Sequence, residues 1–410
     1  MKKRAFMWTV LVIMVSLSLS ASAKTTLLVS RTVGMRGQDL VDQLFMELNP
    51  DIEIEIVGQA GGLQLAEAGG EGLVVQLVSG LVPDVALMAD ATIGRFAAAG
   101  ALTDLTSLLE QGGYFSQFWP TAWDAVRLNG RYWGVPYVTD TRALNYNTDL
   151  FAKAGIGTAP QTLEELDAIA SKLTITAPDG AYEQFGFWPR GGNWWLWGWG
   201  WLFGGSFYDE ATGRITANDP RIVAALEYEV SYVFKYQQPA GDFCTGSLAM
   251  QIDVSTALPY YKQECSALNY ATAPVPPPQG RQTATWSGIW VWAMPKGAPN
   301  PEAAWRYLQF IMTPEAQRIK AIETGEIPTN WQANMELVDE FISEYGESGR
   351  VYLDLTAYTH VRPVIPISNE YWNELEAARN KAYALEATPQ AALDEVTRIL
   401  QAKLDEILGP

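Results

Sequence analysis

The densest chemistry in this sequence is a run of tryptophans. Six of them fall within residues 188–201, where Gly and Trp interleave: Trp188, Trp194, Trp195, Trp197, Trp199 and Trp201. A flat indole ring can pack on the apolar C–H face of a pyranose, and its N–H can donate to a hydroxyl. Core packing is the alternative, and an apolar run ending at Gly204 favours it for the last three. We expect Trp194 and Trp195 to contact a ligand.

A carboxylate and a guanidinium lie two residues apart at Asp140 and Arg142. They stand between a β-like segment, 132–138, and an apolar segment, 143–146. A carboxylate accepts and a guanidinium donates several hydrogen bonds, so together they could hold sugar hydroxyls. A structural salt bridge or a turn is the alternative interpretation.

Material for catalysis is scarce. His360 is the single histidine, and Gly-x-Ser-x-Gly, Walker, His-Glu-x-x-His and Cys-x-x-Cys motifs are absent. A glycosidase-like pair of carboxylates stays open, because Asp and Glu total 46. The formal net charge of −18 argues against nucleic acid as a partner. We expect a binding protein that is not an enzyme and that has no cofactor and no metal site.

Residues 1–23 have the pattern of a cleaved signal peptide. Lys2, Lys3 and Arg4 precede an apolar stretch at 5–19, and Ala21-Ser22-Ala23 forms a small-x-small cleavage site. An uncleaved membrane anchor is the alternative, but the apolar run is shorter than the ~20 residues that a span needs. No cysteine near the cleavage point could be lipidated. We therefore expect a free, exported protein of the periplasm.

Two cysteines remain, Cys244 and Cys265. An oxidising compartment permits a disulfide between them. Two buried free thiols are the alternative.

Strands and helices alternate along the first hundred residues. Apolar runs at 25–30, 51–57 and 84–88 predict strands, and helical spacing at 37–48, 72–80 and 92–99 predicts the helices between them. This order indicates a largely parallel sheet covered by helices, the α/β class. Later helices have capping residues at Thr162, Asp219, Asn300, Thr313 and Thr388.

Several segments, taken in order, resemble one family. Residues 136–156 (PYVTDTRALNYNTDLFAKAGI) look like its signature, and 83–85, 100–102, 204–209, 249–250, 300–317 and 327–329 fit its pattern. The family is the bacterial extracellular solute-binding proteins of family 1, the sugar-binding components of ABC importers. The resemblance covers nearly the whole chain after the signal peptide.

The resemblance implies the two-lobed, type II periplasmic-binding-protein fold, with discontinuous lobes joined by a multi-segment hinge. We expect an N-terminal lobe of residues 24–138 and 288–328 and a C-terminal lobe of residues 139–287 and 329–410. The hinge crossings should fall near 137–143, 287–293 and 328–331. A sugar, best a di- or oligosaccharide because several Trp rings are present, would bind between the lobes of a monomer that delivers it to membrane permease subunits.

Matching positions imply ligand contacts from both lobes. Trp194 aligns with a stacking aromatic of relatives such as maltose-binding protein, whereas Thr256 stands where several relatives have an aromatic. The implied ligand-binding residues are Arg36, Asp90, Asp140, Arg142, Trp194, Trp195, Asp253, Ser255, Trp286, Ser287, Gly288 and Trp372. An exported glycoside hydrolase is the rival class, and polyols or peptides are rival ligands.

Overall fold

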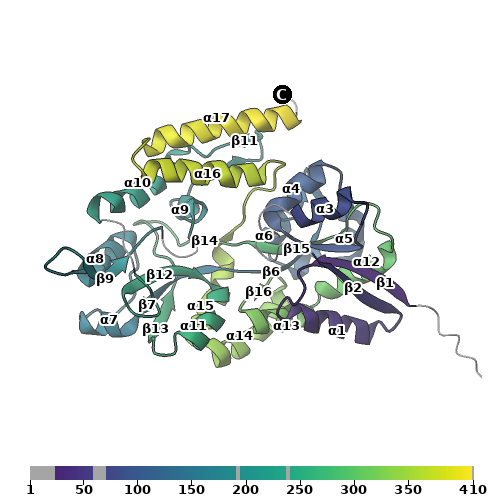
Figure 1. Cartoon of the computed structure of the whole chain (residues 1–410), viewed down its shortest axis with the longest axis horizontal. Coiled ribbons are helices and arrows are strands. Elements are labelled where there is room, and N and C mark those ends of the chain that lie inside the picture. Colours follow the sequence, from purple (N-terminus) through teal and green to yellow (C-terminus); the bar gives the residue numbers. More distant parts are fainter. Residues whose placement is uncertain (1–23, 59–70, 191–193, 237–240, 409–410) are drawn as a thin grey trace, which may run out of the picture.

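Two separate β-sheets organise the chain in the computed structural model, which describes residues 24–58, 71–190, 194–236 and 241–408 (Figure 1). The expected signal peptide lies outside the described residues. We call the part around the first sheet the N-terminal lobe and the part around the second the C-terminal lobe. The two lobes lie side by side, at the right and the left of Figure 1.

The N-terminal lobe contains a six-stranded sheet whose order is β16-β6-β15-β3-β1-β2. The strands β1, β2 and β3 run parallel, as the βαβ pattern predicts, whereas β15 is antiparallel to both β3 and β6. Their bounds are β1 Thr25–Arg31, β2 Ile52–Gly58, β3 Val85–Ala89, β6 Val135–Thr139, β15 Ile289–Ala293 and β16 Ile327–Pro328.

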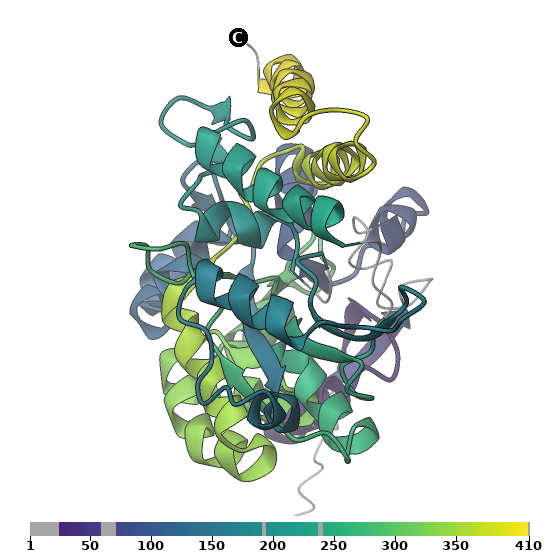
Figure 2. The ribbon, with the colours of Figure 1, turned by 90° about the vertical axis from the view of Figure 1, so that its left-hand side faces the viewer.

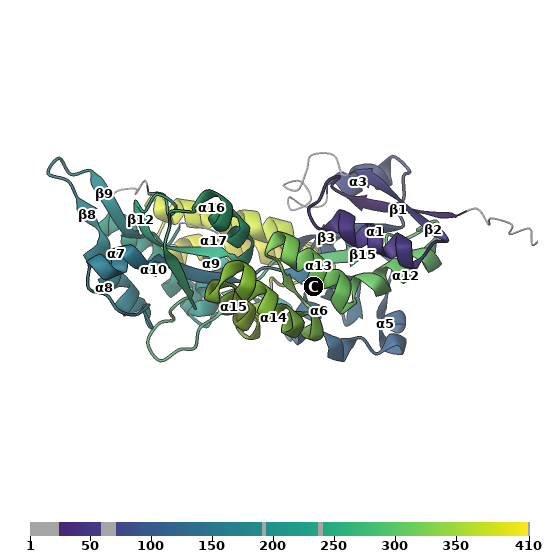
Figure 3. The same ribbon diagram turned by 90° about the horizontal axis from the view of Figure 1, so that it is seen from below.

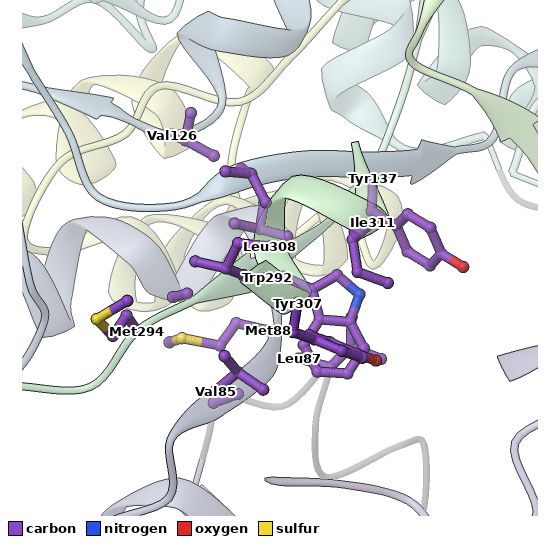
Figure 4. Packing of buried hydrophobic residues seen from close by; sticks show 14 of the residues in the cluster. Val85, Leu87, Met88, Val126, Tyr137, Trp292, Met294, Tyr307, Leu308 and Ile311 are labelled. Atoms are coloured by element: carbon purple, nitrogen blue, oxygen red, sulfur yellow. The ribbon is translucent and has the colours of Figure 1, made fainter. Parts of the chain in front are cut away.

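Helices from two stretches of the chain, residues 38–124 and 301–324, cover this sheet. They are α1 Gln38–Leu48, α3 Glu71–Val78, α4 Asp90–Ala98, α5 Thr106–Gly112, α6 Pro120–Asp124, α12 Pro301–Ile311 and α13 Pro314–Thr324, with the short hairpin β4 Arg127–Leu128 and β5 Arg131–Tyr132. Aliphatic, methionine and aromatic side chains together fill the core between sheet and helices (Figure 4). Trp292 on β15 packs edge-on against Tyr307 of α12, with ring centroids 5.2 Å apart.

The C-terminal lobe contains a five-stranded sheet whose order is β13-β7-β12-β9-β8. Here β12 is parallel to β9, and the other pairs are antiparallel. The bounds are β7 Arg142–Asn147, β8 Ile175–Thr176, β9 Tyr182–Phe187, β12 Leu248–Val254 and β13 Tyr270–Ala273.

Seven α-helices accompany this sheet among the described residues: α7 Thr148–Lys153, α8 Leu163–Leu173, α9 Leu196–Leu202, α10 Pro220–Lys235, α11 Leu258–Glu264, α16 Ser368–Tyr383 and α17 Pro389–Leu408. The paired helices α16 and α17 lie over α10 (Figure 2). A short ribbon, β10 Tyr208–Asp209 with β11 Arg214–Ile215, completes this end of the lobe.

Capping follows the sequence at most of the predicted sites. Thr162 Oγ1 accepts from the Glu165 N–H at 3.2 Å, and Asp219, Thr313 and Thr388 cap their helices in the same way. Asn300 differs, because its side-chain amide donates to the buried carboxylate of Asp84 at 3.1 Å instead of capping α12.

A disulfide joins Cys244 and Cys265, whose Cα atoms are 5.0 Å apart. It ties the turn before β12 to the end of α11. This helix follows the short 3₁₀ turn Ser255–Ala257, so the bridge braces the turn that connects β12 to α11.

The chain passes between the lobes at three places, after β6, after the short strand β14 Thr285–Trp286, and after β16. Beyond the third crossing, α14 Trp331–Tyr345 and α15 Glu347–Asp354 run along one side of the molecule from α13 to the second sheet (Figure 3). A 3₁₀ turn, Leu355–Tyr358, then leads to strand β17 Thr359–His360, which pairs with β14.

A segment that we call the strap, residues 361–367, lies against both lobes. Val361 and Val364 pack on the N-terminal core, whereas Ile365 and Ile367 belong to the C-terminal core. The helix α4 approaches the strap so closely that a Cβ added at Gly94 would lie 2.2 Å from the Ile365 carbonyl oxygen. The strap is thus a non-covalent link between the lobes in addition to the three crossings.

A buried ion pair ties α10 to α16. Glu229 and Arg379 are 0% and 1% exposed, and two hydrogen bonds join them. Because Glu229→Ala leaves the Arg379 guanidinium buried without its main partner, we expect the free energy of unfolding to fall by about 3–5 kcal/mol in denaturant titrations. The double variant Glu229→Leu/Arg379→Met should recover most of this loss. A double variant as unstable as the single one would contradict the ion-pair explanation.

Candidate functional site

The carboxylate of Asp140 stands at the centre of the hinge. It follows β6 in the first crossing, and its Oδ1 accepts from the Gly288 N–H of the second crossing at 3.0 Å. The same oxygen accepts from Arg142 Nη1 at 2.5 Å. One side chain thereby connects two segments that are far apart in sequence. Both of the interpretations that the sequence left open for this pair, a salt bridge and a ligand contact, are compatible with Asp140, whose side chain is 23% exposed.

Arg142 is held on every side. Its Nη1 donates to the Trp286 carbonyl at 2.9 Å, and its guanidinium carbon lies 3.6 Å above the centroid of the Trp286 ring. Thr285 Oγ1 both accepts from the Arg142 N–H and donates to its carbonyl. Burial lowers the pKa of Arg142, and the neighbouring Asp140 opposes that shift. The side chain acts as a clamp between crossing segments and has little surface left for a ligand.

Three tryptophans form a continuous aromatic wall in the C-terminal lobe, which we define as Trp195, Trp286 and Trp372. Trp195 precedes α9, and its ring centroid lies 5.1 Å from that of Trp372 on α16. Trp372 in turn lies 6.1 Å from Trp286. All three are among the ligand-binding residues that the sequence analysis implied. The fold brings them together, although 177 positions separate the first from the last. Trp195 and Trp372 keep part of their surface exposed.

Asp90, at the start of α4, forms an ion pair with Arg362 of the strap. Its carboxylate is 1% exposed. Burial raises the pKa of Asp90, and the Arg362 charge opposes that shift. The Arg362 guanidinium also lies 5.6 Å and 5.3 Å from the centroids of Trp286 and Trp372. In this conformation Oδ1 of Asp90 is paired with Arg362, whereas the buried Oδ2 has no hydrogen-bond partner among the described residues.

A cavity of about 360 Å³ opens in front of the hinge. The loop after β1 and helix α13 line it from the N-terminal lobe, Asp140 and Gly288 from the crossings, and Thr256 from the C-terminal lobe. Its full lining is Thr32, Gly34, Met35, Arg36, Thr139, Asp140, Thr256, Gly288, Trp290, Lys320, Thr324 and Glu326. Four threonines and one partly exposed indole line the cavity, but the hydroxyls of Thr139 and Thr324 are bonded within the protein.

The cations at this cavity each have an anionic partner. Lys320, which is 2% exposed, lies 3.3 Å from Glu326 and donates to the Arg36 carbonyl at 2.8 Å. The exposed Arg36 side chain lies 3.6 Å from Glu323. Together with the Arg142–Asp140 pair, these contacts make the lining nearly neutral in spite of its many charges.

Several predicted contacts lie away from the cavity. Trp194 is 1% exposed, because its ring packs edge-on against Trp199 at 5.7 Å and sits where any side chain at position 198 would have to go. In this conformation it belongs to the core, like Trp197 and Trp199. The alternation of Gly and Trp at 197–201 correctly favoured core positions for Trp197 and Trp199, whereas Trp194 lies outside that alternation and gave no such signal.

Three further predicted residues serve the structure around the cavity. Asp253 accepts from Tyr261 Oη at 2.6 Å, and it thereby fixes α11 behind the Thr256 loop. Ser255 is fully buried, and its N–H donates to the Thr141 carbonyl. Ser287 is likewise buried and donates its N–H to the His360 carbonyl. These residues position the loops that form the cavity without facing it.

Among the residues that sequence reasoning missed are Trp290, Lys320, Glu326 and Arg362. Trp290 could have been found, because it lies within the expected second crossing, two residues after Gly288. Lys320 and Glu326 had no local signal, since a charged residue in a helical pattern is ordinarily solvated. Arg362 depends on a contact that spans 272 residues.

Two smaller cavities, of about 190 and 150 Å³, lie along the strap. Trp201 and His360, whose rings stack at 5.4 Å, line the larger one. Across the described residues, 24–58, 71–190, 194–236 and 241–408, no group of three or more His, Cys, Asp or Glu side chains could hold a metal ion. Among the helices described, none is both long and apolar enough to cross a membrane.

Comparison with known proteins gives relatives along most of the chain. A maltotriose-binding protein of Pyrococcus abyssi is 24% identical over 304 residues, which are 71% of this chain and 62% of the relative. The chain therefore spans less than two thirds of that relative's length. A maltodextrin-binding protein of Bacillus subtilis is 24% identical over 88% of this chain and 85% of its own.

The solved structures agree on the fold. A mannobiose-bound protein has a TM-score of 0.76 at 24% identity, covering 92% of this chain and 99% of the other. The expected two-lobed, type II α/β fold is confirmed. A family model, the bacterial extracellular solute-binding proteins, matches residues 36–318. The chain belongs to the family of bacterial extracellular solute-binding proteins.

Proposed function

We propose that this chain is the extracytoplasmic binding component of an ABC importer and that it captures a di- or oligosaccharide between its lobes. The observation that carries this proposal is the cavity of about 360 Å³, in which hinge residues Asp140 and Gly288 meet side chains of both lobes. A solute in that position touches the elements whose relative motion opens and closes the cleft. A solute bound there therefore contacts the hinge directly.

The lining favours a neutral, polyhydroxylated solute. The hydroxyls of Thr32 and Thr256 can both donate and accept, and Trp290 offers a face for a pyranose ring. The cations Arg36 and Lys320 are paired with carboxylates, so a phosphate or carboxylate ligand would have to compete for them. The maltotriose- and maltodextrin-binding relatives support an oligosaccharide as cargo.

Capture requires no chemical step. A sugar that contacts both lobes binds the closed form more tightly than the open one, and therefore shifts the population towards closure. The closed form would deliver the sugar to membrane permease subunits. We propose that the chain acts as a monomer and has neither catalytic activity nor a cofactor.

We further propose that residues 1–23 are cleaved and that the protein works free in the periplasm. The positive start, the apolar stretch and the Ala21-Ser22-Ala23 site support this, as does the lack of a cysteine close to the cleavage point. The disulfide between Cys244 and Cys265 is compatible with an oxidising compartment. For the lobes we propose residues 24–138 with 288–328, and 139–287 with 329–410, which is supported by the strands of each sheet.

The first test is a thermal-shift and calorimetric screen of residues 24–410. Neutral di- and trisaccharides are compared with a sugar phosphate, a polyol and a dipeptide. A ligand present at 100 times its dissociation constant should stabilise the fold by about 2.7 kcal/mol, and we expect this only for a neutral sugar. The sugar recovered afterwards should be intact. Cleavage would indicate a glycoside hydrolase, and stabilisation by the phosphate alone would overturn the neutral-ligand assignment.

The second test removes the flat face in the cavity. Trp290→Ala should weaken binding of the sugar found above by roughly tenfold, equivalent to about 1.4 kcal/mol, because the stacking contact is lost. Isothermal titration calorimetry gives the dissociation constants. Trp305→Ala is the matched control, since Trp305 is partly exposed on α12 and lies outside the cavity lining. Equal affinities for wild type and Trp290→Ala would rule out this stacking role.

A further inference from the structure

Asp90 and Arg362 form an ion pair whose two members are fixed in different parts of the molecule. Asp90 follows β3 and opens α4 in the N-terminal lobe. Arg362 lies in the strap, with a side chain that is 16% exposed against 1% for Asp90. Solvent therefore screens this pair much less than a surface ion pair.

The guanidinium of Arg362 is also held by the C-terminal lobe. It lies 5.6 Å from the ring centroid of Trp286 and 5.3 Å from that of Trp372, both within the range of cation–π attraction. If the lobes separate, Arg362 must leave either Asp90 on one side or the two tryptophans on the other.

The ion pair lies directly beside the cavity. A Cβ added at Gly288 would be 3.7 Å from Arg362 Nη2 and 3.9 Å from Asp140 Oδ1. Gly288 thus stands between the hinge carboxylate and the Arg362 guanidinium, and it also lines the cavity. A change in the Arg362 contacts would therefore alter the surroundings of Gly288, which lines the cavity in which a solute would bind.

From these contacts we propose that Asp90 and Arg362 form a latch between the lobes that works without a bound sugar. Arg362 is then a positioning residue for capture: it sets the fraction of ligand-free protein that is already closed. This inference rests on the proposed two-lobe capture, but it makes a separate claim about the empty protein. A latch of this kind raises the apparent affinity for any sugar by increasing the closed fraction.

The test measures the distance between the lobes in the absence of sugar. Spin labels on cysteines introduced at exposed positions 43 and 152, one on each lobe, report that distance by pulsed electron paramagnetic resonance. Wild type is compared with Arg362→Met, which keeps an unbranched chain but removes the charge, and with Asp90→Asn, which keeps the shape of the side chain. Circular dichroism melts establish that each variant is folded before the distances are compared.

The matched control is a second ion pair between the lobes. Arg127 of β4 lies 3.2 Å from Glu210, but these side chains are 35% and 71% exposed. Arg127→Met should leave the distance distribution unchanged, because exposed pairs contribute little. Arg362→Lys should retain most of the wild-type distribution, since it keeps the charge near Asp90.

We expect Arg362→Met and Asp90→Asn to move the sugar-free population towards longer distances, with a fall in sugar affinity equal to the fall in closed fraction. Distances in both variants that match wild type would overturn the latch, as would an equal opening in Arg127→Met. Because these distances need no ligand, the latch can fail while sugar binding stands, and it can stand if the screen finds no sugar.

Discussion

The pairing of buried charges at the hinge is the constraint on which the rest of the structure depends. Asp140 is bonded at once to Arg142 and to the Gly288 N–H, so one carboxylate fixes the register of two crossing segments. A buried guanidinium without such a partner lowers the stability of the fold, so Asp140 and Arg142 must be in place together. The sheets on either side can be built independently, but their relative placement is decided at this contact.

The same rule explains why a chain of net charge −18 has a nearly neutral cavity. Arg36, Lys320 and Arg142 each lie against a carboxylate of a neighbouring element. Charges that are paired in this way shape the cavity. Hydroxyls and one indole then remain to contact the solute. Acidity is a property of the outer surface of the protein, and it gives no indication of the ligand.

Local patterns sufficed for the parallel strands β1 to β3 and most helix caps, because these follow from spacing along the chain. The expected hinge crossings came from the family resemblance. Spacing along the chain did not predict which tryptophans are enclosed in the core and which are partly exposed. Trp194 and Trp195 are neighbours with identical surroundings in sequence, yet the first is enclosed by Trp199 and the second meets Trp372. Arg362 depends on Asp90, a partner 272 residues away that only tertiary packing brings close, so periodicity and capping rules could not indicate it.

Because of the strap, closure of the lobes involves more than bending at the three crossings. Three covalent crossings allow the lobes to bend about one line, but Val361 and Val364 on one core and Ile365 and Ile367 on the other add a packed layer beside that line. Bending must therefore shear apolar contacts as well as rotate backbone torsions. Interiors pack in discrete arrangements, so such a layer favours two distinct positions over a continuous range. The contacts between Asp140 and Arg142 fix the position of the hinge, and the packing of the strap limits how far the lobes can rotate about it.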